Sequence, residues 1–319
     1  MLDSYYATTN CMDTIIVKFI IFQLCIWIPI GAGSYLAQHT AYNVQQLSSR
    51  LVTINLVSLE AFIVLWTTWG AELSVHYIVL PFAGIVMVIM GFAAGAAVSF
   101  LLGFNAIQKH TVIISSSLAN HGFTMGGFLC YLILGEHGLA LSFIFITYFM
   151  PYVILVIFSY ARYVGTKQPF SLRNYIITPQ NMPLFAIVVA IILHALNIKR
   201  PAINIPIDIL LCISIIIYYF SMGIYFKFTH IKNYCLLHLL IAIIKFCIIP
   251  LCMYIVLCQF SLPEDIQSVI RLQSYMPAAV YSVITSILFH LDKEMATSIF
   301  IVNTVAFSII VLPALIIIF

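Results

Sequence analysis

The chain has 319 residues, of which 63% are hydrophobic and only 7% are charged. Soluble globular domains average roughly 45–50% apolar and about 25% charged residues, so this composition excludes a soluble protein and indicates an integral membrane protein. The formal net charge of +3 is small, and nothing in its distribution indicates a nucleic-acid-binding surface.

Ten apolar runs are long enough to cross a bilayer, whose core of about 30 Å takes about 20 helical residues. In chain order, the predicted spans are 14–36, 48–69, 77–103, 109–134, 138–163, 183–198, 203–226, 234–259, 266–290 and 295–318. The first run follows Asp3 and Asp13 rather than basic residues, so it is predicted to be a span and not a signal peptide. The fold class is therefore an all-α integral membrane protein.

The basic residues between the spans predict the orientation, because cytoplasmic loops are enriched in Lys and Arg. With the N-terminus outside, the outer loops carry only Lys199 and Arg200. The inner loops then carry Arg50, Lys109, Arg162, Lys167, Arg173, Lys227, Lys232 and Lys293. We expect a multi-pass protein of the plasma membrane, which is the inner membrane in a bacterium, with both termini outside.

A polar connection at 164–182 separates five spans in residues 1–163 from five in residues 183–319. If two halves with an odd number of spans are structural repeats, they must be inverted relative to each other. The predicted organisation is two inverted five-helix repeats joined by a cytoplasmic linker. The oligomeric state stays open, and a homodimer is compatible with the sequence.

The fourth span of each half carries residues that interrupt a helix. The first-half span reads LANHGFTMGG at residues 118–127, with Gly122 after Asn120, and the second-half span has Pro277 at the equivalent point. Glycine permits unwinding and proline removes a backbone donor, so both spans are predicted to open near mid-membrane. Open backbone persists in a membrane only where it lines a protein-enclosed or watery cavity. Two breaks at matched positions indicate a transporter substrate site.

The alternative for these breaks is ordinary kinks, with Gly126 and Gly127 serving close helix packing. Elsewhere, the GxxxG pattern of Gly91 and Gly95 in the third span is predicted to serve helix packing alone.

Half-helix N-termini at such breaks favour an anionic ligand, because they present unpaired N–H groups and the positive end of the helix dipole. Asn120 is the strongest candidate, since its amide can donate or accept at the substrate. His121 could carry a proton, or it could be a hydrogen-bonded histidine without function. The predicted substrate-binding residues are Asn120, His121, Gly122, Thr124, Ser274, Met276, Pro277, Ala278 and Tyr281.

Four ionisable residues in or at the ends of spans form a second set of candidates, because a charge at bilayer depth costs about 2.5–3.5 kcal/mol on insertion scales. Glu60 and Lys245 lie deepest. They form either a structural ion pair, or one of them is the coupling site that titrates during transport. Asp208 begins a span and could be interfacial, and Arg271 could snorkel to the headgroups.

The sequence offers little for catalysis or metal binding. The eight cysteines include no CxxC pair, and the nine histidines show no HxxxH or HExxH spacing, so neither a metal site nor a cofactor is expected. GxSxG and paired intramembrane aspartates are also absent, which argues against an enzyme.

Four motifs in order along the chain resemble those of one membrane-protein family. The stretch ANHGFTMGGFLCYLILGEHGLAL carries an Asn-x-Gly break and a Gly-Glu-x-Gly-Leu-Ala turn, and NMPLFAIVVAIILHALNIKRP resembles the family's sixth span. KFCIIP, from Lys245 to Pro250, resembles its eighth span. MPAAV, at Met276 to Val280, is followed by an acidic turn and a span with a proline near its end. The chain thereby resembles the auxin efflux carrier family of permeases over nearly its whole length.

This resemblance implies two inverted five-helix repeats whose interrupted fourth and ninth helices cross at the centre, as in the bile-acid transporters. It also implies a secondary active permease that carries a small organic anion or amino acid by alternating access, coupled to H⁺. The alternatives are a sodium-coupled symporter like the bile-acid transporters and a non-transporting membrane receptor or scaffold. No carboxylate lies within either break, which argues against sodium ligands there.

Overall fold

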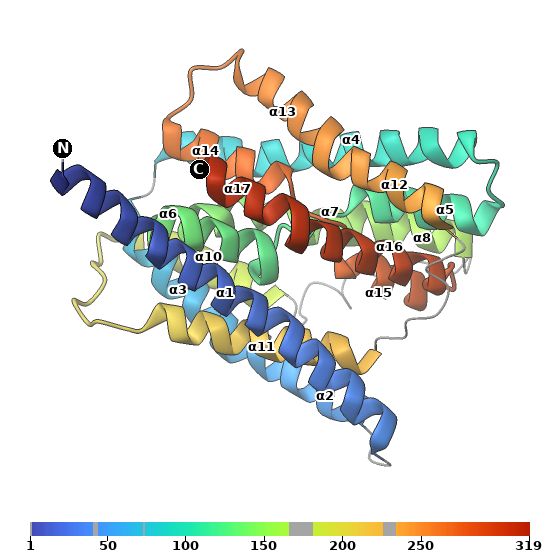
Figure 1. Cartoon of the computed structure of the whole chain (residues 1–319), viewed down its shortest axis with the longest axis horizontal. Coiled ribbons are helices and arrows are strands. Elements are labelled where there is room, and N and C mark those ends of the chain that lie inside the picture. Colours follow the sequence, from blue (N-terminus) through green and yellow to red (C-terminus); the bar gives the residue numbers. More distant parts are fainter. Residues whose placement is uncertain (1, 41–43, 73, 166–180, 226–233) are drawn as a thin grey trace.

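A computed structural model describes residues 2–40, 44–72, 74–165, 181–225 and 234–319 (Figure 1). Within these residues nearly all of the backbone is helical, and the one β pairing is an isolated antiparallel bridge between Ala119 and Ala278. Six helices of the described part are long and apolar enough to cross a membrane. The protein is therefore an all-helical membrane protein.

The helices are labelled in chain order, and η marks short 3₁₀ or π-helical turns. The first half contains α1 (Leu2–His39), α2 (Val44–Ile54), η1 (Asn55–Glu60), α3 (Ala61–Gly70), η2 (Val75–Ile78), α4 (Val79–Leu101), α5 (Ala106–Ser117), η3 (Phe123–Gly127), α6 (Phe128–Phe145), η4 (Ile146–Tyr148), α7 (Phe149–Tyr152), η5 (Val153–Ile157) and α8 (Phe158–Gly165). The second half contains α10 (Met182–Ala195), α11 (Ile207–Tyr225), α12 (Cys235–Ile243), η8 (Ile244–Ile248), α13 (Ile249–Leu257), α14 (Glu264–Ser274), α15 (Val280–Leu288), α16 (Lys293–Ala306), η9 (Phe307–Val311) and α17 (Leu312–Ile318).

Each of the ten ranges predicted to be spans contains helix, with some differences in extent. Helical backbone extends from Thr124 to Val164, over 41 residues. Gly135 inside this run has φ +69°, which is not helical, and divides the run into two helices. Glycine is suited to this point because it adopts positive φ without steric cost. The predicted linker lies mostly within 166–180, outside the described residues.

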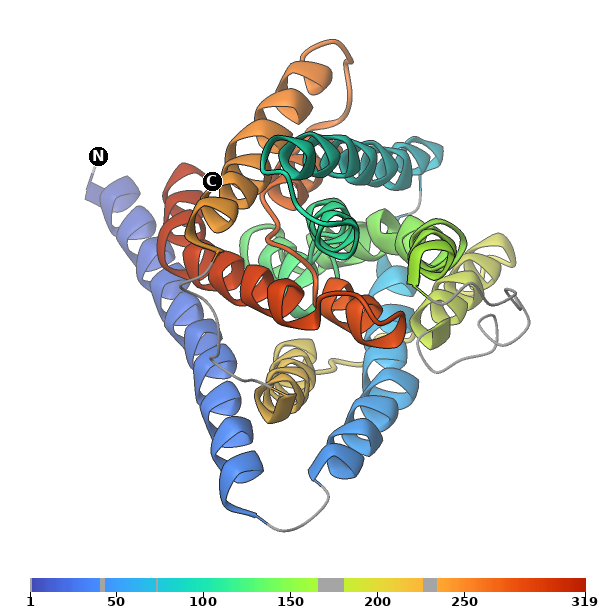
Figure 2. The same ribbon diagram turned by 90° about the vertical axis from the view of Figure 1, so that its right-hand side faces the viewer.

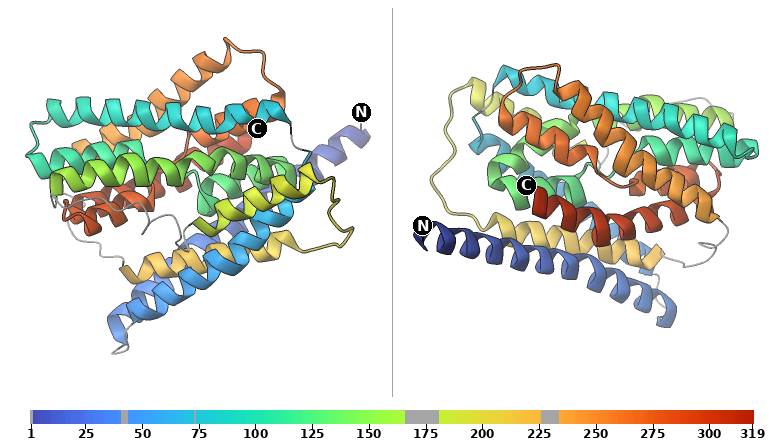
Figure 3. Two further views of the ribbon diagram at one scale, coloured as in Figure 1. Left: turned by 180° about the vertical axis from the view of Figure 1, so that it is seen from behind. Right: turned by 45° about the horizontal axis from the view of Figure 1, so that its top comes forward.

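The described helices pack as two groups that do not coincide with the two halves of the sequence. In the first helix group, α1 packs along α11, α2 packs on α11, and α3 packs on α10. Figure 2 shows α1 and α2–α3 as two blue arms with the gold α11 between them, and the right-hand view of Figure 3 shows α1 running alongside α11. The second helix group contains α4 to α8 and α12 to α17, in which α5 packs on α4, α15 and α16.

The GxxxG pattern of α4 serves helix packing, as predicted. A Cβ added to Gly91 would lie 2.3 Å from the Ser116 carbonyl oxygen, and one added to Gly95 would lie 2.7 Å from the Ser116 side chain. Both glycines therefore permit close approach of α4 to α5, the helix that leads into the first break.

Candidate functional site

The first predicted break is present between α5 and η3. Helix α5 ends at Ser117, and the backbone is extended at Leu118 and again at Gly122 before helix resumes at Phe123. No side chain of the described residues caps the start of η3 at Phe123, while the Gly122 carbonyl accepts from the Met125 N–H at 3.2 Å and the Asn120 carbonyl accepts from the Gly126 N–H at 3.2 Å.

The second predicted break lies between α14 and α15. Helix α14 ends at Ser274 and α15 begins at Val280, after extended backbone at Ala279. Pro277 lies in this gap, where its missing N–H and fixed ring disfavour helix. The start of α15 also has no side-chain cap.

The two open segments cross and pair through their backbones. Asn120 N–H donates to the Pro277 carbonyl at 2.8 Å, and Ala279 N–H donates to the Leu118 carbonyl at 3.1 Å. These bonds flank the bridge between Ala119 and Ala278. Buried backbone groups need such partners, so each break satisfies polar groups that the other leaves without a helical partner.

Lys245 supports this crossing. Its side chain is fully buried in η8, and its Nζ donates to the Leu118 carbonyl at 3.1 Å. Of the two alternatives for Glu60 and Lys245, the structural ion pair is absent from the described residues, and Glu60 instead accepts a hydrogen bond from the Tyr218 hydroxyl. Lys245 therefore donates to a backbone carbonyl at the break and not to a carboxylate.

A cavity of about 710 Å³ begins at the crossing. Of the nine predicted substrate-binding residues, Asn120, Gly122, Thr124 and Tyr281 line it. The remaining five do not line it: His121, Ser274, Met276, Pro277 and Ala278. The Ser274 hydroxyl donates to the Arg271 carbonyl, and the other four are buried at the crossing itself, so these five have structural surroundings.

Asn120 lines the cavity and has a buried side-chain donor without a partner among the described residues. Its Oδ1 accepts a hydrogen bond from Thr124 Oγ1 at 3.1 Å. Its Nδ2 is buried and has no hydrogen-bond partner among the described residues. An unsatisfied buried donor costs about 1–3 kcal/mol, so rotation of this amide toward an acceptor in the cavity would be favourable.

His121 points away from the cavity. Its Nδ1 and the Tyr148 hydroxyl are hydrogen bonded at 2.5 Å, and the ring packs edge-on against Phe145 with 5.2 Å between centroids. The ring also contacts a backbone group of Gln273, beside the second break. These contacts favour the structural alternative for His121.

Glu60 is the predicted charged residue that does line the cavity. It ends η1, where it accepts the hydrogen bond from Tyr218 of α11 and interacts electrostatically with Tyr281 of α15. Sequence reasoning missed Tyr218, because α11 contains three tyrosines, Tyr218, Tyr219 and Tyr225, and nothing in the sequence separates Tyr218 from the other two.

The other two predicted charged residues lie elsewhere. Asp208 is exposed at the start of α11 and lines a second pocket of about 480 Å³ together with Glu136 and Tyr131. Arg271 donates to Gln267 Oε1 at 2.8 Å, one turn away in α14. Neither residue lines the main cavity.

In the described part of the chain, the lining of the main cavity extends to one end of the helices only. Along α2, η1 and α3 its lining runs from Ser48 to Val64, and its mouth includes the exposed Lys293 and Glu294 at the start of α16. Trp66 and Thr68, two and four residues beyond Val64, belong to a polar network instead of the cavity lining.

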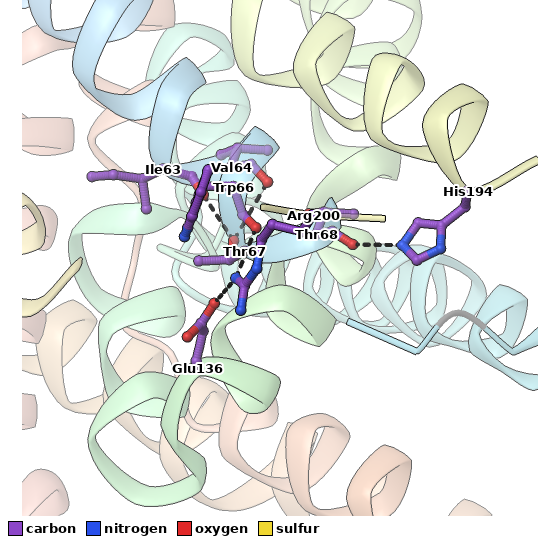
Figure 4. A network of polar contacts seen from close by, with 8 residues as sticks. All are labelled: Ile63, Val64, Trp66, Thr67, Thr68, Glu136, His194 and Arg200. Carbon is purple, nitrogen blue, oxygen red and sulfur yellow. Dashed lines mark hydrogen bonds and ion pairs between the residues drawn. The ribbon is translucent and has the colours of Figure 1, made fainter. Parts of the chain in front are cut away.

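This network joins the two helix groups (Figure 4). Arg200, which follows α10, forms an ion pair with Glu136 of α6 and donates to the Trp66 carbonyl at 3.1 Å. Its guanidinium also lies 5.2 Å from the Trp66 ring centroid. His194 Nε2 donates to the Thr68 carbonyl at 3.2 Å. The cavity is therefore closed at the end where α3 finishes.

A scan against models of protein families finds none that matches the chain, and a search of curated proteins finds no significant match.

Proposed function

We propose that the protein is a secondary active permease of the auxin efflux carrier type, which moves a small organic anion or amino acid across a membrane by alternating access coupled to protons. The observation that carries this proposal is the antiparallel crossing of two open backbone segments at the point where a cavity begins. In a membrane, irregular backbone of this kind is characteristic of transporter binding sites.

The arrangement of the helices supports an inverted repeat of ten spans. The first helix group takes the first two helical spans of each sequence half, namely α1 and α2–α3 with α10 and α11. Both breaks lie in the fourth range of their half. Such correspondence is expected when two repeats of the same topology interlock.

The chemistry of the crossing supports an acidic group on the substrate. The uncapped starts of η3 and α15 present backbone N–H groups, and Asn120 adds its Nδ2 donor at the same place. Helix N-termini favour anions for this reason.

The closed and open ends support alternating access. The network of Arg200 with Glu136 joins the two helix groups where α3 ends, and the cavity opens where α16 begins. With the termini outside, as the loop charges predict for a plasma membrane protein, this conformation faces inward.

The proposal is tested with purified protein in liposomes. Flux of labelled monocarboxylates, dicarboxylates and amino acids is measured with and without an imposed pH gradient. We expect at least one of these acids to move, and the pH gradient to change its rate. If none moves through protein that remains folded, the chain is not a permease of this type.

A further inference from the structure

The carboxyl group inside the cavity disfavours a simple anion whenever it is ionised. Glu60 is the one carboxylate of the described residues that lines the cavity away from its mouth. Among the described residues the buried cation is Lys245, which donates to the Leu118 carbonyl at the crossing and does not line the cavity. A carboxylate that faces the site repels an anion and attracts a cation.

Glu60 is held in place by neighbouring side chains. It accepts a hydrogen bond from the Tyr218 hydroxyl, which also bonds with Asn55. Asn55 in turn donates to Ser214 Oγ at 2.8 Å. This chain of contacts fixes one side of the carboxylate and leaves it at the cavity wall. A charge at this depth needs a partner or a function.

Hydrogen-bond donors, which suit an anionic group, lie at the crossing. The buried Asn120 side chain, 6% exposed, lines the same cavity and its Nδ2 has no partner among the described residues. The uncapped start of α15 is next to it, since Ala279 is bonded to Leu118 and Tyr281 lines the cavity. This is a place for a carboxylate, separate from Glu60.

Apart from these polar groups, much of the cavity wall is apolar. Its lining includes Phe143, Phe149, Phe300 and Ile284, as well as the ring of Tyr281. A volume of about 710 Å³ is within the usual range of small-molecule sites, and such a wall favours a ligand with a large apolar group.

We infer that the substrate is a zwitterion with a large apolar side chain, such as an aromatic amino acid. Its ammonium group binds Glu60, its carboxylate binds Asn120 Nδ2 and the start of α15, and its side chain packs on the aromatic wall. This inference rests on the proposed function and narrows its substrate class. A simple anion would leave Glu60 unpaired, and a simple amine would leave Asn120 unpaired.

Three probes that differ by one charged group test this assignment. Phenylalanine carries both groups, 3-phenylpropionate lacks the ammonium, and phenethylamine lacks the carboxylate. Binding of each to the purified wild-type protein is measured by calorimetry, and flux is measured in liposomes. We expect phenylalanine to bind about tenfold or more tightly than either analogue, because each analogue loses one charge-assisted hydrogen bond.

The variant Glu60→Gln tests whether Glu60 binds the ammonium group of the substrate. We expect it to lose the preference for phenylalanine over 3-phenylpropionate and to bind 3-phenylpropionate more tightly than the wild type does. Glu264→Gln is the matched control, because Glu264 is exposed at the start of α14 and does not line the cavity. This control should bind the three probes with the same order of affinities as the wild type.

The result with wild-type protein decides the inference even if a variant fails to fold. Equal or tighter binding of 3-phenylpropionate overturns the zwitterion assignment, while its transport would still support the proposed permease. Binding of none of the three probes overturns the assignment too, and the panel of other acids then judges the permease separately.

Discussion

Asn120 and Pro277, from opposite halves of the chain, are joined by a backbone hydrogen bond of 2.8 Å from the N–H of Asn120 to the carbonyl of Pro277. The bond uses no side-chain atom of Asn120. The amide side chain can therefore be removed without removing the link between the two broken helices, which separates a role in binding from a role in folding.

We predict that Asn120→Ala folds normally but loses transport. Removing a donor to a charged acceptor costs about 1.5–3 kcal/mol, which corresponds to a loss of about tenfold or more in affinity. Flux is measured in liposomes, and folding is checked by thermal unfolding. Asn303→Ala is the matched control, because Asn303 is also buried with an unpartnered amide in the described part of the chain but does not line the cavity. Wild-type flux by Asn120→Ala would rule out its role.

We predict that Lys245→Met does not lower the melting temperature. The Leu118 carbonyl loses the ammonium but keeps its bond from the Ala279 N–H. The lost hydrogen bond, about 1.5–3 kcal/mol, is offset because the variant no longer buries an ammonium, a burial that costs several kcal/mol. Thermal unfolding in detergent measures the difference. A fall of about 5 °C or more would mean that the ammonium stabilises the crossing by more than its burial costs.

We predict that Gly70→Ala loosens the closed end. A Cβ at Gly70 would lie 2.2 Å from Arg200 Cζ, so the guanidinium must move away from Glu136. A partly exposed ion pair contributes about 0.5–1 kcal/mol, so opening should become about two- to fivefold more frequent. The measurement is labelling of Thr68→Cys, a position buried under the network, by a membrane-impermeant maleimide.

Lys199→Ala is the control for this experiment, because Lys199 is an exposed cation adjacent to Arg200. It should leave the labelling rate unchanged. If Gly70→Ala and Lys199→Ala label equally, displacement of Arg200 does not open this end.

We predict that protons and substrate exchange at Glu60, because one carboxylate cannot hold a proton and a substrate ammonium together. The titratable groups that face it are Tyr218 of α11 and Tyr281 of α15. Acid outside liposomes loaded with labelled phenylalanine should therefore accelerate efflux, and Glu60→Gln should remove this acceleration. Liposomes with equal pH on both sides give the baseline. Acid-driven uptake in place of efflux would contradict exchange.

The positions of both breaks could be predicted from sequence, because Gly122 and Pro277 act on the backbone locally. The directions of the neighbouring side chains could not. In a helix a period of 3.6 residues relates position to face, but an open segment has no such period. Met276 and Ala278 were therefore predicted to bind substrate although they are buried at the crossing, outside the cavity lining.

The partners of the buried charges also could not be predicted. Glu60 and Lys245 are the deepest opposite charges in the sequence, so an ion pair between them was one of the two alternatives. Their real partners are a tyrosine hydroxyl and a backbone carbonyl. Neither partner has a distinctive sequence signal, because every residue has a carbonyl and the chain has 18 tyrosines.

The centre of this molecule is fastened by main-chain atoms, since the pairing of Ala119 with Ala278 and its flanking bonds use only peptide groups. Because this pairing uses only peptide groups, we expect other small residues to be accepted at positions 119 and 278. The side chains that contact the substrate beside this pairing can therefore be changed to suit a different solute while the two broken helices stay joined.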